Sequence, residues 1–495
     1  MTRLSRFVSW QGMPYLLTFV VLLLAALLVR LAMPFEFPIP WNDETVFIAP
    51  AHTLSSDGTF FVDALNAERV VMWMPPGYTL LLAGVFKVVG YSFDIARWVS
   101  TVCWLVGVLL GLLLVRQLAL PRRYLLCALA ATLLAFLSPY VLANSKIARM
   151  EAFYTALFLA SLLALLRGLP GIGLALVLAS AVVHFNAVYM LLPYGVLLGW
   201  LILTRQSLIL RASELAALVL AAAVLAAYAL MIAGNLNGFL EDMAFQFEFK
   251  RSMGEPMSGP LGWLKVGLAL CFAVAQLVYL RRFGAEVVLS LYGTAFMALA
   301  LHGQSMWYFF SLVLGAWLLL LSALSMLAHA QRSWLRRCSV LLACGFAGVL
   351  VLQGYAKREP FTPLWPRAEL LQRPFLPPAE IERIRQWAGS LPPGTRVSFG
   401  YTGIEPFFFA ELHTAGVIWS ASRHNVLEVF PARKDHYRVV CDSALYPKGL
   451  LIYDWDISPP RQGLDAGCRI EARHALETEK LMLDMPCRTI RDERT

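Results

Sequence analysis

Residues 212–233 read ASELAALVLAAAVLAAYALMIA, and this stretch decides the class of fold. Apart from Ser213, Glu214 and Tyr228, every residue in it is apolar. About 20 consecutive, largely apolar residues are enough for an α-helix to cross the hydrocarbon core of a bilayer. The stretch therefore predicts a membrane-spanning helix.

Stretches of this kind recur along the first 355 residues. The same criterion predicts eleven spans, near residues 15–33, 95–117, 124–142, 151–167, 171–186, 188–203, 212–233, 263–281, 285–301, 306–328 and 338–354. The whole chain of 495 residues is 59% hydrophobic and only 15% charged, with a mean hydropathy of +0.64. We therefore expect a polytopic α-helical membrane protein and not a soluble globular one.

Charged residues divide the chain into two domains. Residues 1–355 carry 36 of them and the last 140 residues carry 37, so a membrane domain (1–355) precedes a water-soluble domain (356–495). A helical pattern at 379–389 and β-like runs at 395–400, 415–420 and 449–454 predict a small α/β fold for the second domain.

Basic residues in short loops indicate the orientation in the membrane. With the N-terminus inside, thirteen arginines fall on the cytoplasmic side: Arg3, Arg6, Arg116, Arg122, Arg123, Arg167, Arg205, Arg211, Arg281, Arg282, Arg332, Arg336 and Arg337. The first span lacks a small-residue cleavage site and is expected to remain as an anchor. An odd number of spans places the first loop (34–94), the stretch 234–262 and the C-terminal domain on the outer side.

The net charge of +9 lies almost entirely in the membrane domain, where it records topology. No Lys/Arg-rich run with interleaved aromatic residues indicates a nucleic-acid partner. No CxxC or HExxH spacing indicates a bound metal, although a divalent metal is not excluded. In the C-terminal domain, Cys441, Cys468 and Cys487 allow one disulfide and one free thiol, with three pairings open.

Two acidic residues stand just after the first span, in the sequence Trp41-Asn42-Asp43-Glu44-Thr45. About thirty residues later, Pro75-Pro76-Gly77-Tyr78 opens an apolar segment that ends at Gly90 and is too short to span. A segment of that length is expected to lie in the membrane interface or to re-enter against other helices.

This arrangement resembles the GT-C membrane glycosyltransferases, in particular the dolichyl-phosphate-mannose protein mannosyltransferases and the lipid A aminoarabinose transferases. Those proteins carry an Asp-Glu pair in the first outer loop, followed by a Pro-Pro-containing amphipathic stretch. Ala148-Arg149-Met150-Glu151 is similar to the Arg-x-Asp stretch of the family, with Glu in place of Asp. The number of spans and the outer C-terminal domain match as well, so the resemblance covers most of the chain.

The resemblance implies an inverting transfer of a sugar from a polyprenyl-phosphate donor to an acceptor on the outer face of the cytoplasmic membrane. The acceptor would be a lipid, a glycan or a protein. By its place in the motif, Asp43 is the expected general base, and Glu44 its orienting partner. Glu151, His184 and Tyr78 are expected to bind substrate.

Positive charge is needed where the phosphate leaving group develops. Arg149, Lys250, Arg251, Arg69 and His302 are the expected donor-phosphate or lipid-binding residues. Nine basic residues map to the outer side or near it: Arg30, Arg69, Lys87, Arg97, Lys146, Arg149, Lys250, Arg251 and Lys265. These are candidate phosphate-binding residues, and for Lys87, Arg97 and Lys265 we favour the alternative that they snorkel to lipid headgroups.

The chain also departs from the aminoarabinose transferases. His184-Phe185-Asn186 stands where those relatives have Thr-Lys-Gly-Pro, and Trp73-Met74 stands where they have Glu-Lys before the Pro-Pro. These changes put a metal site and donor contacts of that type in doubt. A lipid or sugar transporter or flippase is the alternative from another class, and a noncatalytic assembly subunit is a third.

The orientation is testable by cysteine labelling. In intact cells, a membrane-impermeant thiol reagent is expected to label the C-terminal domain, because that domain lies on the outer side. Protection of its cysteines until the membrane is permeabilised would contradict this topology.

Overall fold

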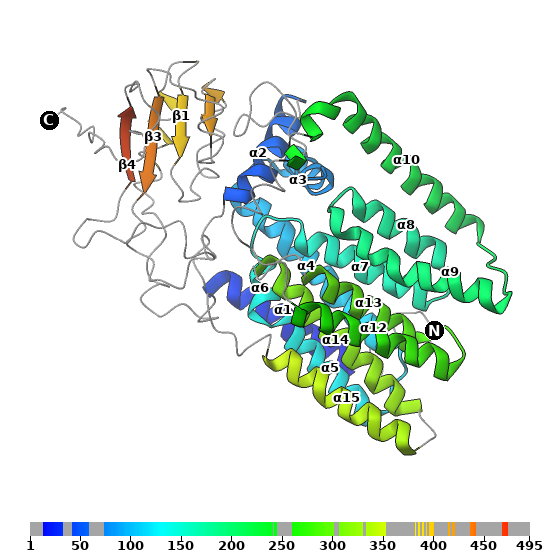
Figure 1. Ribbon diagram of the computed structural model, residues 1–495. Coiled ribbons are helices and arrows are strands. Elements are labelled where there is room, and N and C mark those ends of the chain that lie inside the picture. Colours follow the sequence, from blue (N-terminus) through cyan, green and yellow to red (C-terminus); the bar gives the residue numbers. More distant parts are fainter. Residues whose placement is uncertain are drawn as a thin grey trace, which may run out of the picture.

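The computed structural model describes residues 13–32, 42–58, 74–240, 242–244, 260–300, 306–329 and 333–352. It also describes short pieces of the C-terminal region, namely 382, 385–386, 389–390, 393, 396–399, 414–415, 418–420, 436–441 and 468–473. Figure 1 shows a bundle of helices with a small sheet to one side. The helices are α1 (Met13–Ala32), α2 (Asn42–Ser56), α3 (Gly77–Val89), α4 (Phe93–Gln117), α5 (Arg122–Phe136), α6 (Pro139–Asn144), α7 (Glu151–Leu166), α8 (Pro170–Ala181), η1 (Phe185–Leu191), α9 (Leu192–Thr204), α10 (Ala212–Gly234), α12 (Pro260–Leu280), α13 (Ala285–Leu299), α14 (Met306–His329) and α15 (Ser333–Val351).

The helices are those of a membrane protein, but the described residues do not bear out eleven crossings. Five helical stretches among them are long and apolar enough to span: Phe93–Gln117, Phe185–Thr204, Ala212–Gly234, Trp263–Leu280 and Phe310–Ala328. Helices also occupy the other predicted spans, yet α7, α8 and α13 have only 16, 12 and 15 residues. Proline explains one shortening, because the predicted span 124–142 is split into α5 and α6 just before Pro139.

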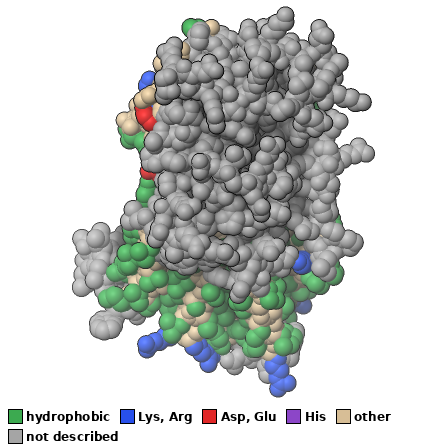
Figure 2. Space-filling view, turned by 90° about the vertical axis from the view of Figure 1, so that its left-hand side faces the viewer, with side chains coloured by type: hydrophobic (Ala, Val, Ile, Leu, Met, Phe, Trp, Pro, Cys, Tyr) green, Lys and Arg blue, Asp and Glu red, His purple; other side chains and the backbone are tan. Residues whose placement is uncertain are grey.

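The surface of the bundle suits a lipid environment. Large apolar side chains are exposed on α9 and α10, among them Leu203 (82%), Val219 (69%) and Leu230 (73%). In Figure 2 hydrophobic side chains cover the described part of the face in view, with Lys and Arg side chains at its lower rim. Nine arginines predicted to face the cytoplasm are exposed here: Arg116, Arg122, Arg123, Arg167, Arg205, Arg211, Arg281, Arg282 and Arg337.

The interior packs through small residues and shared hydroxyl groups. Helices α13 and α14 cross where Gly293 faces Gly315, and a Cβ added to either would lie within about 3 Å of the other's carbonyl oxygen. The Ser161 hydroxyl of α7 donates to the Gly173 carbonyl (2.8 Å) and lies 2.7 and 2.6 Å from the hydroxyls of Tyr194 and Tyr292. Such hydrogen bonds satisfy polar groups inside the bundle and hold neighbouring helices in register.

The first outer loop of the prediction is built onto the bundle through α2 and α3, which pack on each other. The Gly77 N–H donates to the Val182 carbonyl (2.7 Å), at the turn that follows α8. A Cβ at position 77 would lie 2.6 Å from that oxygen, so only glycine permits this approach. The segment predicted to be interfacial or re-entrant is therefore a 13-residue helix whose start is docked on the bundle.

Four strands lie in the C-terminal region: β1 (Arg396–Phe399), β2 (Ile418–Ser420), β3 (His436–Cys441) and β4 (Cys468–Arg473). They form one sheet of order β2-β1-β3-β4, in which β1 is parallel to both neighbours and β3 is antiparallel to β4. β1 and β2 lie in the β-like runs expected at 395–400 and 415–420. The run expected at 449–454 lies outside the described residues, and β3 and β4 were not predicted.

The register of this sheet selects one disulfide among the three that the sequence leaves open. Cys441 in β3 stands directly opposite Cys468 in β4. Facing residues of antiparallel strands have Cα atoms about 4.5–5.5 Å apart, inside the usual range for a disulfide.

Peptide mapping of protein purified without reductant is therefore expected to recover a Cys441–Cys468 bond with Cys487 as the thiol. A bond from Cys487 to either residue would contradict the register.

Candidate functional site

A buried carboxylate joins three separate parts of the chain. Glu44, in the first turn of α2, is completely buried and accepts hydrogen bonds from Arg97 Nε (3.0 Å) and Arg97 Nη2 (2.6 Å). The Ala148 backbone N–H donates to the same carboxylate (2.8 Å). Glu44 thereby ties α2 to α4 and to the turn that precedes α7.

The position of the Arg97 side chain contradicts one prediction. This side chain was expected to snorkel to lipid headgroups, but it is fully buried and forms a two-pronged ion pair with Glu44. Its guanidinium also lies 4.6 Å from the centre of the Phe93 ring. A buried arginine needs a carboxylate to offset its lost hydration, and Glu44 is that partner. Lys87 and Lys265, by contrast, are exposed, and Lys87 Nζ donates to the Ser55 carbonyl (3.3 Å).

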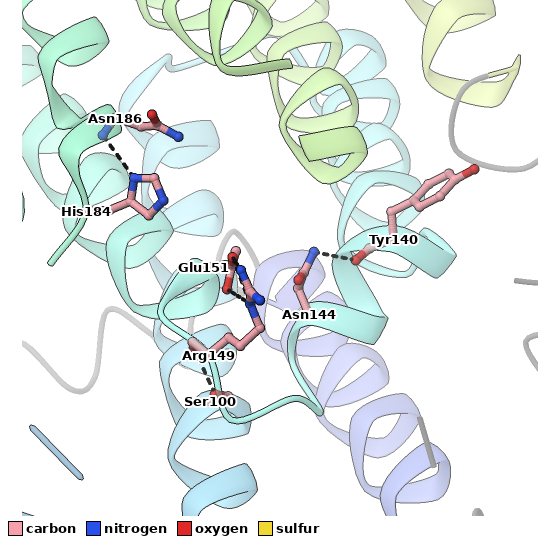
Figure 3. Close-up of polar contacts among 7 residues, drawn as sticks. All are labelled: Ser100, Tyr140, Asn144, Arg149, Glu151, His184 and Asn186. Atoms are coloured by element: carbon pink, nitrogen blue, oxygen red, sulfur yellow. Dashed lines mark hydrogen bonds and ion pairs between the residues drawn. The ribbon is translucent and has the colours of Figure 1, made fainter. Parts of the chain in front are cut away.

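A second buried ion pair lies on the same turn. Arg149 Nη2 is 3.1 Å from Glu151 Oε1, and Arg149 Nε donates to both carboxylate oxygens of Glu151 (3.2 and 3.3 Å). Both residues are at least 95% buried. The pair stands at the N-terminal end of α7, where a carboxylate is also stabilised by the helix dipole (Figure 3).

A relay of hydroxyl groups holds this turn in place. Ser100 Oγ in α4 donates to the Arg149 carbonyl (3.3 Å), and the Tyr78 hydroxyl lies 2.8 Å from Ser100 Oγ. Burial raises the pKa of the Tyr78 hydroxyl well above its usual value. Because the one proton of Ser100 Oγ goes to the Arg149 carbonyl, Tyr78 is the donor between the two hydroxyl groups. Tyr78, expected to bind substrate, therefore has its hydroxyl engaged with the protein and supports the backbone of Arg149.

The cluster carries an excess of positive charge among its described side chains. Lys146 is also buried (3% exposed), so three cations, Arg97, Lys146 and Arg149, accompany two carboxylates, Glu44 and Glu151. Lys146 is one of the predicted outer basic residues, and it joins Arg149 on the turn between α6 and α7.

His184 lies beside α7 but serves a local structural purpose. Its Nδ1 accepts a hydrogen bond from the Asn186 N–H (2.9 Å) and so caps η1, and its ring centre is 5.2 Å from that of Tyr154 (Figure 3). The acceptor role of Nδ1 leaves Nε2 as the protonated nitrogen of the neutral ring. The substrate-binding role expected for His184 stays a prediction.

Several predicted site residues cannot be placed. Asp43 belongs to α2 by its backbone, but its side chain is outside the described part of the structure, and so is that of Arg30. Arg69, Lys250, Arg251 and His302 also lie outside the described residues. Glu44, Arg149 and Glu151 are thus the predicted residues that the structure brings together, with Tyr78 in support.

Within the described ranges, no group of three or more His, Cys, Asp or Glu side chains could hold a metal ion.

Sequence reasoning missed Arg97 and Ser100 as members of the cluster. Arg97 had a usable signal, because a charged residue near the start of an apolar span is costly unless it is paired. Ser100 had none, since a single serine in a span is common and its partners, Tyr78 and Arg149, are distant in sequence.

A scan against protein-family models found no match, and a search of curated proteins found no significantly similar one.

The central ion pair makes a stability prediction. Replacing Arg97 with Met leaves Glu44 buried without its cation, so the free energy of unfolding is expected to fall by about 3–5 kcal/mol. Arg385→Met is the control, because Arg385 and its partner Glu382, 3.0 Å apart, are 40% and 52% exposed; a change of at most about 1 kcal/mol is expected there. Unfolding of both variants in the same detergent is the measurement. Equal losses would show that the Glu44–Arg97 pair does not hold the cluster.

Proposed function

We propose that the chain is an inverting glycosyltransferase that moves a sugar from a polyprenyl-phosphate-linked donor to a lipid, glycan or protein acceptor. In this proposal the reaction takes place at the outer face of the cytoplasmic membrane. The shorter apolar helices complete eleven crossings, and the region that contains β1–β4 is a small α/β domain on the outer side.

The chemistry requires three things of the protein. A carboxylate takes the proton of the acceptor hydroxyl as its oxygen attacks the anomeric carbon, and this is the part assigned to Asp43. The bond between that carbon and the phosphate oxygen breaks on the opposite side, which inverts the configuration. The polyprenyl phosphate that leaves gains negative charge, and a fixed cation next to it stabilises the transition state.

The observation that carries the proposal is the anchoring of Glu44. Because the Glu44 carboxylate binds Arg97 and the N–H of Ala148, the backbone of Asp43 is held next to the turn that bears Lys146 and Arg149. A general base and a phosphate site must be only a few ångströms apart to act on one sugar. The two halves of the resemblance, the Asp-Glu pair and the Arg-x-Glu stretch, are thus neighbours in space although about one hundred residues separate them.

The buried cations of the cluster agree with an anionic donor. Because Arg149 is buried, its charge is screened little by salt or water. Arg149 is directed by Glu151 and by the Phe47 ring, whose centre is 6.0 Å from the guanidinium carbon. An oriented guanidinium can hold two phosphate oxygens at once, which a mobile surface lysine does not do.

A transporter or flippase has less support. Such proteins place charged residues near the middle of the bilayer, on discontinuous helices. In the described segments, the buried charged side chains Arg97, Glu151, Glu214 and Glu286 lie within the first two turns of a helix, and Lys146 and Arg149 lie on the turn before α7.

The general-base assignment is tested by Asp43→Asn in purified, reconstituted protein. Transfer from a labelled polyprenyl-phosphate sugar is expected to fall by about 10²–10⁴-fold, since an amide cannot accept the proton. Asp57→Asn is the matched control, because Asp57 is an exposed acid just after the other end of α2 and its variant should keep near wild-type transfer. Transfer by Asp43→Asn at the wild-type rate would remove Asp43 from the mechanism. Following the label into lipid, glycan or protein also identifies the acceptor.

A further inference from the structure

A cavity lies inside the bundle next to the Arg149–Glu151 pair. Its enclosed part measures about 20 Å³, which is room for about one water molecule or one hydroxyl group, and it is lined by residues of α4, α5, α6, α7 and α14. Helical spacing explains how the lining forms. Glu151 and Thr155 are four residues apart on α7, and Val141 and Asn144 are three apart on α6, so each pair shares one face of its helix.

Three polar atoms of the lining have no hydrogen-bond partner within the protein. They are Trp104 Nε1, Asn144 Oδ1 and Thr155 Oγ1, and their residues are 3%, 4% and 7% exposed. Buried polar groups are almost always satisfied in folded proteins, so three unsatisfied atoms around one cavity call for a partner that is not part of the chain. Most of the remaining lining is apolar, as in binding sites where a few polar groups fix the orientation of a ligand.

The types of these atoms define the chemistry of that partner. The Trp104 N–H can only donate, Asn144 Oδ1 can only accept, and the Thr155 hydroxyl can do either. The orientation of Asn144 is set by its amide nitrogen, which donates to the Tyr140 carbonyl (3.1 Å), so Oδ1 is left for the cavity (Figure 3). A hydroxyl group both donates and accepts, and therefore satisfies such a set.

The aromatic rings of the lining limit further which partner the cavity can bind. Trp104, Phe136 and Phe310 all line the cavity, and the rings of Trp104 and Phe136 meet edge to face with centres 6.5 Å apart. Flat apolar faces beside hydrogen-bonding groups suit a hydroxyl group carried on a C–H-rich carbon, and the enclosed space admits such a group but not a whole sugar ring.

We propose that this cavity is a binding pocket for a hydroxyl group, with Trp104, Asn144 and Thr155 as its recognition residues. The hydroxyl group comes either from the sugar of the donor or from an ordered water, which typically bonds to about three buried polar groups. The sugar source rests on the proposed function, whereas the water source does not. In either case the occupant lies next to Glu151, at the edge of the charged cluster.

Thr155→Val tests the pocket, since valine has nearly the same shape as threonine but no hydroxyl group. Melting temperatures are measured in nanodiscs for the protein alone, with decaprenyl phosphate, and with a panel of decaprenyl-phosphate sugars. If water fills the pocket, Thr155→Val melts several degrees below the wild type without any lipid. If a hydroxyl group of the sugar enters the pocket, a sugar-bearing lipid binds the wild type more tightly than decaprenyl phosphate does. This gain in affinity is then about three- to tenfold smaller in Thr155→Val.

Two further variants make the result specific. Thr155→Ser keeps a hydroxyl group and is expected to restore whichever effect Thr155→Val removes. Thr45→Val is the matched control, because Thr45 Oγ1 is equally buried and unsatisfied but Thr45 does not line the cavity. Its removal is expected to be neutral or stabilising.

The pocket proposal is overturned if Thr155→Val behaves like Thr45→Val without lipid and also shows the wild-type response to every lipid of the panel. A separate outcome concerns the proposed function. If neither decaprenyl phosphate nor any of its sugar derivatives stabilises the wild type, the glycosyltransferase proposal fails, while the melting temperature without lipid still decides whether water occupies the pocket.

Discussion

The bonding of the Glu44 carboxylate is the constraint on which the rest of the site depends. Three hydrogen bonds reach this carboxylate, two from a guanidinium 53 residues away and one from a backbone N–H 104 residues away. Neither Glu44 nor Arg97 reaches solvent, so each would be unstable without the other. The pair thus forces α2, α4 and the turn before α7 to meet, and every other contact of the cluster is arranged around that meeting.

Several of these contacts are made by residues that would not themselves touch a substrate. They hold in place the residues that would. Tyr78 is brought to Ser100 because Gly77 lets the start of α3 approach the turn after α8, and Ser100 in turn holds the carbonyl of Arg149. Support of this kind keeps charged groups oriented before any ligand arrives, which is the condition for electrostatic stabilisation of a transition state. The apolar cavity next to Glu151 adds a place where a neutral hydroxyl group could lie against the charged cluster.

Prediction from sequence worked best for the helices. A helix occupies each stretch predicted as a span. In apolar stretches such as 212–233 the backbone faces lipid, and there its N–H and C=O groups can form hydrogen bonds only with each other, as they do in a helix. The number of crossings was harder to predict from the sequence. Pro139 interrupts one apolar stretch, and the helices α7, α8 and α13 are shorter than the apolar stretches in which they lie. The strand β4 was missed although it carries a usable signal, because Cys468, Ile470 and Ala472 alternate with Arg469, Glu471 and Arg473. In β3 the alternation covers only the first four residues, His436 to Val439.

Local composition was enough to show that this is a helical membrane protein. Spacing along the chain was enough to single out the Asp43-Glu44 pair and the Arg149–Glu151 stretch. Only the tertiary structure decided that Arg97 belongs inside and not at the lipid surface, that Tyr78 supports Arg149 through Ser100, and that Trp104, Asn144 and Thr155 border one cavity. These outcomes depend on pairings between distant segments. Burial makes such pairings strong by removing water, yet no local pattern in the sequence records which partner each side chain meets.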